Sequence, residues 1–283
     1  MKNNKILITG SDGFLGKALY QRLISAGEHN IELFDIKNGS IEDYDFSNYN
    51  ANHVFHFAAR TFVPQSWEES YDYYKVNFLG TINILEYCRK NNTSMTFLST
   101  YMYGTPDYLP IDEKHPRKAN SIYHHSKLLA EDACEFYSKQ FNIPITILRL
   151  FNVYGQEQRK DFLIPTIIQK ALYDDVIEIL DTKPKRDFIY IDDVIDAIIL
   201  STENTGFNIY NVGSGISYSV LEVANKICNA LEINKDIIDK KQIRMNEIND
   251  VIADISKIKS ELGWTPKITI DDGIKKIINS MKE

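Results

Sequence analysis

The segment GSDGFLG, from Gly10 to Gly16, decides the fold of this chain. It follows the short apolar run ILIT and precedes a stretch in which Leu15, Leu19 and Leu23 recur at every fourth position. A strand that passes through a glycine turn into a helix brings the free N–H groups of the helix N-terminus close to an anion such as a pyrophosphate. The spacing predicts a dinucleotide-binding turn between a strand over residues 5–9 and a helix over residues 14–26.

The rest of the first half continues this alternation of apolar strands and amphipathic helices. We expect strands over residues 32–35, 54–57, 95–99 and 145–150, with helices ending near residues 90–92 and spanning 126–139. Such an order is typical of a parallel sheet covered on both faces. The predicted fold is α/β: a doubly wound Rossmann sheet with a smaller, interleaved C-terminal substrate domain.

The predicted domain boundary lies after Gly155. Residues 1–155 form the expected dinucleotide-binding domain, with contributions from about 186–215, where residues 207–212 read as a strand that returns to the main sheet. Residues 156–283 are expected to form mainly the substrate domain, with helices over 163–172, 192–202 and 219–231 and a last helix around Ile274–Met281.

Composition and charge narrow the possible partners. The 283 residues carry a net charge of −7, so the chain has no basic field for nucleic acid or anionic lipid. No apolar run reaches membrane-spanning length, and the N-terminus passes at once into the first strand, so we expect a cytoplasmic protein. Cys88, Cys134 and Cys228 form no CxxC pair, which predicts reduced thiols and no metal site.

An acidic residue ends the second predicted strand, 19 residues after Gly16. Asp35 stands where a carboxylate can accept hydrogen bonds from the hydroxyls of the adenosine ribose. The same carboxylate repels a 2′-phosphate, which favours NAD over NADP, although Lys37 lies close enough in sequence to soften that repulsion. The alternative is that Asp35 has only a structural role in the turn at the end of the strand.

The segment YHHSK, residues 123–127, carries the predicted chemistry. Tyr123 and Lys127 are four residues apart and therefore share one face of a helix. A tyrosine needs a neighbouring positive charge to act as an acid or base near neutral pH, because a free phenol has a pKa of about 10. Ser99, at the end of a predicted strand, is expected to hold the substrate oxygen in line with Tyr123.

These motifs resemble the NAD-dependent epimerase/dehydratase branch of the extended short-chain dehydrogenase/reductase family, whose members modify nucleotide sugars. The stretches that carry the resemblance are GSDGFLG (10–16), FHFAA (55–59), VNFLGTINILEYC (76–88), FLSTYMYG (97–104), YHHSK (123–127), LRLFNVYG (148–155), RDFIYIDDV (186–194), YNVGSGISYSVLEVA (210–224) and ADISKIKSELGWTPK (253–267). They cover nearly the whole chain in the order of the family.

The resemblance implies roles for residues that spacing alone does not assign. Together with the turn, the implied dinucleotide contacts are Gly10, Gly13, Phe14, Leu15, Gly16, Asp35, Asp45, Phe46, Phe57, Ala58, Ala59, Asn77, Tyr123, Lys127 and Phe151. The implied substrate contacts are Ser99, Thr100, Asn152, Arg186, Arg244 and Glu247. Glu247 stands where the family more often has Asp, and Met245-Asn246 replaces a common Pro-Gly, so the nucleotide contact departs from the family pattern.

The residues after Ser99 separate the possible reactions. In 4,6-dehydratases of the family an Asp-Glu pair follows the Ser/Thr, and here Thr100 and Tyr101 stand in those places. The prediction is therefore an NAD-dependent nucleotide-sugar 4-epimerase, with a nucleotide-4-keto-sugar reductase as the alternative. A non-catalytic dinucleotide-binding sensor is disfavoured because Ser99, Tyr123 and Lys127 are all present. The resemblance also implies a homodimer formed through the helices around residues 78–90 and 124–139.

Overall fold

The computed structural model describes residues 5–101, 104–243 and 247–281. The chain forms two units, and each contains several separate stretches of sequence. The first unit comprises residues 1–104, 116–150 and 195–210. The second comprises residues 105–115, 151–194 and 211–283.

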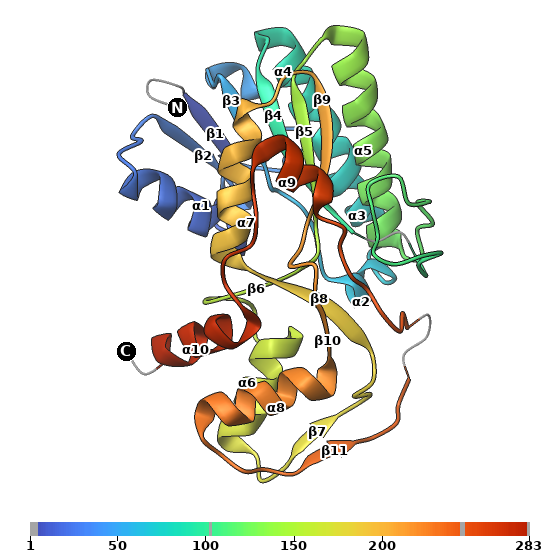
Figure 1. The fold of residues 1–283 in the computed structure, drawn as a ribbon. Coiled ribbons are helices and arrows are strands. Elements are labelled where there is room, and N and C mark those ends of the chain that lie inside the picture. Colours follow the sequence, from blue (N-terminus) through green and yellow to red (C-terminus); the bar gives the residue numbers. More distant parts are fainter. Residues whose placement is uncertain (1–4, 102–103, 244–246, 282–283) are drawn as a thin grey trace. The chain divides into compact units, whose positions relative to one another are not determined.

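A six-stranded sheet forms the centre of the first unit (Figure 1). In chain order its strands are β1 (Ile6–Thr9), β2 (Ile31–Phe34), β3 (His53–His56), β4 (Ser94–Thr100), β5 (Ile145–Leu150) and β9 (Phe207–Val212). Their order across the sheet is β2-β1-β3-β4-β5-β9, and the pairs from β2 to β5 are parallel. The fold is therefore the predicted doubly wound parallel sheet.

Helices on both faces bury the apolar side chains of these strands. They are α1 (Phe14–Ser25), α2 (Val63–Ser66), α3 (Ser70–Tyr74), the π-helical turn η3 (Lys75–Leu79), α4 (Gly80–Asn91), α5 (Ile122–Phe141) and α7 (Ile191–Leu200), with short 3₁₀ turns η1 (Ile36–Asn38), η2 (Phe46–Asn48) and η4 (Ser201–Glu203). Arg22 on α1 pairs with Asp196 on α7 at 2.6 Å. Figure 1 shows α4 and α5 side by side on the opposite face.

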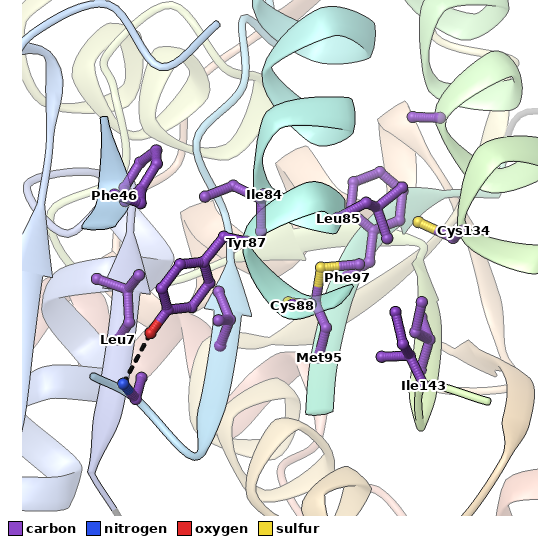
Figure 2. Packing of buried hydrophobic residues seen from close by; sticks show 14 of the residues in the cluster. Leu7, Phe46, Ile84, Leu85, Tyr87, Cys88, Met95, Phe97, Cys134 and Ile143 are labelled. Carbon is purple, nitrogen blue, oxygen red and sulfur yellow. Dashed lines mark hydrogen bonds between the residues drawn. The ribbon is translucent and has the colours of Figure 1, made fainter. Parts of the chain in front are cut away.

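The core beneath α4 and α5 is continuous across the sheet (Figure 2). Ile84, Leu85 and Cys88 from α4 pack with Met95 and Phe97 from β4, and all five are buried. The hydroxyl of Tyr87 accepts a hydrogen bond from the backbone N–H of Ala51 at 2.8 Å, so this polar atom is satisfied inside the apolar cluster.

The strand order places the carboxyl ends of β1 and β3 side by side. The chain leaves β1 toward β2 on one side and later returns to form β3 on the other, which is the topological switch point of the sheet. Ligands of doubly wound sheets bind outside the carboxyl ends of the strands at this point. The glycine turn that follows β1 lies there.

Smaller sheets and further helices make up the described part of the second unit. One sheet has the order β10-β8-β6, and a two-stranded sheet pairs β11 with β7. The strands are β6 (Asn152–Tyr154), β7 (Ile177–Ile179), β8 (Lys185–Tyr190), β10 (Ser217–Ser219) and β11 (Ile237–Asp239). The helices are α6 (Leu163–Tyr173), α8 (Val220–Leu231), α9 (Ser256–Leu262) and α10 (Ile270–Ser280). No helix within the described ranges is long and apolar enough to cross a membrane.

Candidate active site

Glycine is required at two positions of the turn after β1. Gly10 has a φ of +72°, and a Cβ there would lie 2.6 Å from the backbone nitrogen of Ala58. A Cβ on Gly16 would lie 2.1 Å from the carbonyl oxygen of Gly10. Because real Cβ atoms do not approach backbone this closely, the turn can lie against the end of β3 and the first turn of α1 only with glycine at both positions.

The turn has the features of a phosphate site. Helix α1 follows Gly13 and has no side-chain cap, so its N-terminus offers backbone N–H groups and a positive dipole end. The Ser11 hydroxyl is buried and has no hydrogen-bond partner among the described residues. An orphaned donor beside an uncapped helix N-terminus suits a pyrophosphate, and the sequence reading did not single out Ser11.

Asp35 is held in a defined position at the end of β2. Its carboxylate accepts hydrogen bonds from the backbone N–H groups of Asp12 and Ile36, both at 2.8 Å. Lys37 pairs with Asp12 at 2.7 Å rather than with Asp35 itself. The fixed negative charge of Asp35 is compatible with ribose hydroxyls and disfavours a 2′-phosphate.

Asp45 and Phe46, the two residues predicted to lie at the adenine, differ in how accessible their side chains are to a ligand. Asp45 accepts a hydrogen bond from the backbone N–H of Ser47 at 2.9 Å and begins the turn η2. Phe46 is only 4% exposed, and its ring packs against Phe34 and Tyr44 at centroid distances of 4.9 and 5.0 Å. The ring of Phe46 therefore belongs to the core, and only its backbone is available to an adenine.

The segment after β3 is anchored to β1. The hydroxyl of Thr9 accepts hydrogen bonds from the backbone N–H groups of Phe57 and Ala58 at 3.2 and 3.3 Å. Ala59, like these two residues, is partly exposed at this edge of the sheet. The segment expected to line the cofactor is therefore held beside the glycine turn.

Asn77 lies in η3, and its side chain holds the backbone of Arg60, the residue after Ala59. Its side-chain oxygen accepts from the Arg60 N–H at 2.8 Å, and its amide donates to the Arg60 carbonyl at 3.0 Å and to the Ser126 hydroxyl at 2.9 Å. Both amide hydrogens are thus used within the protein. Asn77, which is predicted to contact the cofactor, thus also holds the backbone of Arg60 beside the site.

Tyr123 and Lys127 lie on the first turns of α5. Ser121 begins this helix by accepting a hydrogen bond from the backbone N–H of His124 at 3.2 Å. The ammonium of Lys127 lies 4.0 Å from the centroid of the Phe97 ring, and Tyr123 packs against Tyr73 with ring centroids 6.5 Å apart. The helix therefore presents both side chains beside the end of β4.

Burial changes the acid–base properties of both groups. It raises the pKa of the Tyr123 phenol and lowers the pKa of the Lys127 ammonium to about 8. A hydrogen bond with the Thr100 side chain opposes the shift at Tyr123, and the negative charge of Glu131 opposes the shift at Lys127. The protein alone therefore keeps Tyr123 protonated at neutral pH, and a further positive charge is needed to make it a base.

Ser99, expected to hold the substrate oxygen in line with Tyr123, and Thr100, expected to contact the substrate, are the last two residues of β4. Successive side chains of a strand point to opposite faces, so Ser99 and Thr100 at the end of β4 cannot both face the same group. Thr100 is partly exposed, and its side chain opposes the rise that burial causes in the pKa of Tyr123. The Ser99 hydroxyl is buried and has no partner in the described part of the chain.

The expected nucleotide contacts of the second unit form an internal ion pair. The guanidinium of Arg186 pairs with Glu247 and also donates to the carbonyl of Ile248 at 2.6 Å. Arg244 lies outside the described residues. The carboxylate of Glu247 already occupies part of the Arg186 guanidinium. A diphosphate bound there would therefore either share the guanidinium with Glu247 or displace the Glu247 carboxylate.

Phe151 and Asn152 come directly after β5 in the sequence and belong to the second unit. Phe151 is buried, and the amide of Asn152 donates to the carbonyl of Asp187 at 3.0 Å. Asn152 thus has a structural contact in addition to its predicted place at the substrate. The described residues contain no cluster of His, Cys, Asp or Glu that could hold a metal ion.

The fold and these residues define a class of dinucleotide-dependent α/β enzymes with a Tyr-Lys pair, and comparisons with known proteins give the family. The family described as GDP-mannose 4,6 dehydratase matches residues 27–277. A putative UDP-glucose 4-epimerase of Methanocaldococcus jannaschii is 34% identical, and the alignment covers 98% of each chain. The chain belongs to the extended short-chain dehydrogenase/reductase family of NAD-dependent epimerases and dehydratases, as its motifs predicted.

Solved structures give the same result. The UDP-glucose 4-epimerase of Thermotoga maritima, determined with UDP-glucose, has a TM-score of 0.92 and 26% identity over 98% of each chain. The protein MoeE5, determined with UDP-glucose and NAD, has a TM-score of 0.90 and 26% identity, also over 98% of each chain. The similarity therefore covers both units of the chain.

Proposed function

We propose that this protein is an NAD-dependent nucleotide-sugar 4-epimerase. The observation that carries the proposal is the arrangement at the end of β4, where Ser99 and Thr100 provide hydroxyls and where Tyr123 and Lys127 share one face of α5. Residues 99–101 are Ser, Thr and Tyr, so the segment offers hydroxyls and no carboxylate. Such a site supports oxidation and reduction of a sugar hydroxyl and lacks the acid and base needed for dehydration.

Each residue of this arrangement has a separate task. Tyr123 takes the proton of the sugar 4-hydroxyl and later returns a proton to the 4-keto oxygen. Thr100 orients that oxygen, a role that its partly exposed hydroxyl suits better than the buried hydroxyl of Ser99. Lys127 contributes a positive charge below its pKa of about 8, which favours the phenolate.

The dinucleotide would be held by the residues around the glycine turn. Gly10, Gly13 and Gly16 allow the helix N-terminus to approach the pyrophosphate, Ser11 offers its unpartnered hydroxyl, and Asp35 accepts from the ribose. The remaining expected contacts are Phe14, Leu15, Asp45, the backbone of Phe46, Phe57, Ala58, Ala59, Lys127 and Phe151. The dinucleotide held there would supply hydride acceptance and return and the positive charge of its oxidised nicotinamide.

The second unit would bind the nucleotide end of the substrate. Arg186 is the expected contact for the diphosphate, and Arg244 and Glu247 are expected to hold phosphate and ribose. Asn152 is expected to lie at the sugar. The relatives that were determined with UDP-glucose support a nucleoside diphosphate sugar as the substrate class.

An epimerase recycles its dinucleotide and tends to retain it, whereas a reductase must exchange it in every turnover. The first experiment is therefore to purify the protein, denature it and identify any released dinucleotide by mass spectrometry. Near-stoichiometric NAD⁺ supports the epimerase, and NMR of UDP-glucose or UDP-galactose mixtures then measures inversion at C4. An empty protein that oxidises NADH or NADPH with a 4-keto sugar would instead establish the reductase.

Two neighbouring variants test the assignment of the hydroxyl. Thr100→Val is expected to lower kcat by about 10- to 100-fold, because it removes the group that orients the reacting oxygen. Ser99→Ala removes a hydroxyl without a partner in the described chain and is expected to change kcat by less than about threefold. The reverse order of effects would return the role to Ser99. Tyr123→Phe separates an enzyme from a sensor, because a sensor has no turnover to lose.

A further inference from the structure

A chain of buried hydrogen bonds leads away from the glycine turn through the interior of the first unit. The hydroxyl of Thr9, the residue before Gly10, lies 2.8 Å from Nδ1 of His56 on β3. Nε2 of the same imidazole lies 3.0 Å from the hydroxyl of Thr81 on α4. Thr81 in turn donates to the backbone carbonyl of Asn77 at 2.6 Å. All four residues are buried, so these contacts are shielded from water.

The chain continues from Asn77 to the catalytic helix. The amide of Asn77 donates to the hydroxyl of Ser126 at 2.9 Å. Ser126, which is also buried, donates to the backbone carbonyl of Tyr123 at 2.7 Å. Hydrogen bonds therefore connect the end of β1 to the residue proposed as acid and base.

The direction of every donor in this chain is determined by its neighbours. Thr81 uses its single hydroxyl hydrogen on the Asn77 carbonyl, so it must accept from Nε2–H of His56. Burial lowers the pKa of His56 to about 3, so the ring is neutral and carries only that hydrogen. Nδ1 must then accept from the Thr9 hydroxyl. All donors point from the glycine turn toward the backbone of Tyr123. They form two runs of aligned hydrogen bonds that meet at Asn77, whose backbone carbonyl accepts and whose side-chain amide donates.

His56 also contacts the surroundings of Lys127. Its imidazole stacks on the Phe97 ring at a centroid distance of 5.6 Å with an interplanar angle of 27°. The Lys127 ammonium lies 4.0 Å from the centroid of the same Phe97 ring. The Phe97 ring thus contacts both His56 and Lys127, while the hydroxyl of Thr9 anchors the backbone of Phe57 and Ala58.

We propose that His56 is a positioning residue that holds the cofactor turn and the Tyr123–Lys127 helix in register through the Thr9–His56–Thr81–Asn77–Ser126 chain. The inference rests on the proposed function, because register between cofactor and phenol matters only if both act on one substrate. Reacting groups that are misplaced by about 1 Å lose about 100-fold in rate. The hydrogen-bond chain therefore keeps the cofactor turn and the helix in register, in addition to satisfying buried polar atoms.

The test interrupts the hydrogen-bond chain at Thr81, which lies in its middle and contacts neither the glycine turn nor Tyr123. Thr81→Val keeps the shape of the side chain and removes both the donor and the acceptor. Thr81→Ser restores the hydroxyl. Ser138→Ala is the matched control, because Ser138 is buried on the same helix as Ser126 and donates to the Ile143 carbonyl at 2.6 Å outside the chain. Unfolding midpoints, kcat and KM for epimerisation, and NADH affinity by fluorescence are measured for each.

We expect Thr81→Val to lower kcat by about 10- to 100-fold with KM for the nucleotide sugar within about twofold, and to weaken NADH binding by about tenfold. Thr81→Ser should recover most of both losses, and Ser138→Ala should lower only the unfolding midpoint. A Thr81→Val protein that resembles Ser138→Ala, less stable but with unchanged kcat and NADH affinity, would overturn the proposal.

Two further measurements keep the result interpretable. If Thr81→Val does not fold, Ser126→Ala interrupts the chain on the same helix as the Ser138→Ala control and is judged by the same criteria. If the wild-type protein does not epimerise any nucleotide sugar, the proposed function fails, and NADH affinity alone then decides the inference. Equal NADH affinity in Thr81→Val and wild type would refute the coupling in that case.

Discussion

Replacing Lys127 with methionine is expected to stabilise the fold while abolishing the proposed activity. The side chain of Lys127 is only 3% exposed, and burial lowers its pKa from 10.5 to about 8 despite the opposing effects of Cys134 and Glu131. A difference of this size corresponds to about 3 kcal/mol of free energy by which folding disfavours the charged form. Methionine has a similar length and carries no charge, so it removes this penalty.

The expected gain depends on pH with a definite sign. Because the pKa of Lys127 is lower in the folded than in the unfolded protein, the folded state binds fewer protons between pH 8 and pH 10.5. The penalty is therefore complete below pH 8 and disappears as the pH rises toward 10.5. We expect Lys127→Met to raise the free energy of unfolding by about 1 to 3 kcal/mol at pH 7 and by much less near pH 10.

Urea unfolding of protein stripped of dinucleotide, at pH 7 and pH 10, measures this difference. Lys139→Met is the control, because the Lys139 side chain lies on the same helix, is 62% exposed and pairs with Glu135 at 2.5 Å on the surface. Removing such a surface pair changes stability by less than about 1 kcal/mol. A destabilised Lys127→Met protein, or a gain equal at both pH values, would refute the reasoning.

Three further predictions follow, two from close contacts of single residues and one from the resemblance to the family. Gly16→Ala should abolish dinucleotide retention, because the added Cβ would lie 2.1 Å from the Gly10 carbonyl oxygen; mass spectrometry of the denatured protein checks this, and retention at the wild-type level would contradict it. Arg149→Met should destabilise the protein by about 3 kcal/mol in urea unfolding, because it removes the buried partner of the Glu131 carboxylate at 2.6 Å and leaves only the more exposed Arg117 at 3.3 Å; a loss below about 1 kcal/mol would contradict it. Light scattering should find a homodimer, and a single species of 32.7 kDa would exclude it.

The parallel sheet could be predicted from the sequence because its strands are short apolar runs bounded by turns. The structure has β5 and β9 at residues 145–150 and 207–212 as predicted, and the other four strands begin and end within about one residue of the predicted ranges. The three-residue strands of the second unit were not predicted. β7 and β11 pair although their first residues, Ile177 and Ile237, are far apart in the chain, and such short segments have no period of their own.

Helix α5 shows how a local signal can be overlooked. The apolar pattern predicted a helix from Ser126, whereas the spacing of Tyr123 and Lys127 placed both on one helix; the structure begins the helix at Ile122 and so agrees with the spacing. The segment Tyr123-His124-His125 has no apolar period, which delayed the predicted start. Ser121 is nevertheless a favoured residue before a helix, and its side chain caps the first turn.

The site was predictable in residue types more than in contacts. The sequence contains Ser99 and Thr100 side by side, and only the orientation of β4 decides which hydroxyl faces Tyr123. The partners Arg186 and Glu247 are 61 residues apart, so their ion pair could not be read from spacing. Long-range pairs of this kind depend on the folded backbone and not on any local pattern.

Unsatisfied polar atoms give an independent indication of where a ligand belongs. Buried hydroxyls are almost always hydrogen bonded, so each exception needs an explanation. Among the described residues of the first unit, the side-chain exceptions are the hydroxyls of Ser11 and Ser99, which lie just after β1 and near the end of β4. These strands end at the same edge of the parallel sheet, whereas His56 and Thr81 in the interior are fully paired. Polar groups are therefore left open at the edge where a doubly wound sheet binds its ligand, and satisfied where the protein must hold that edge rigid.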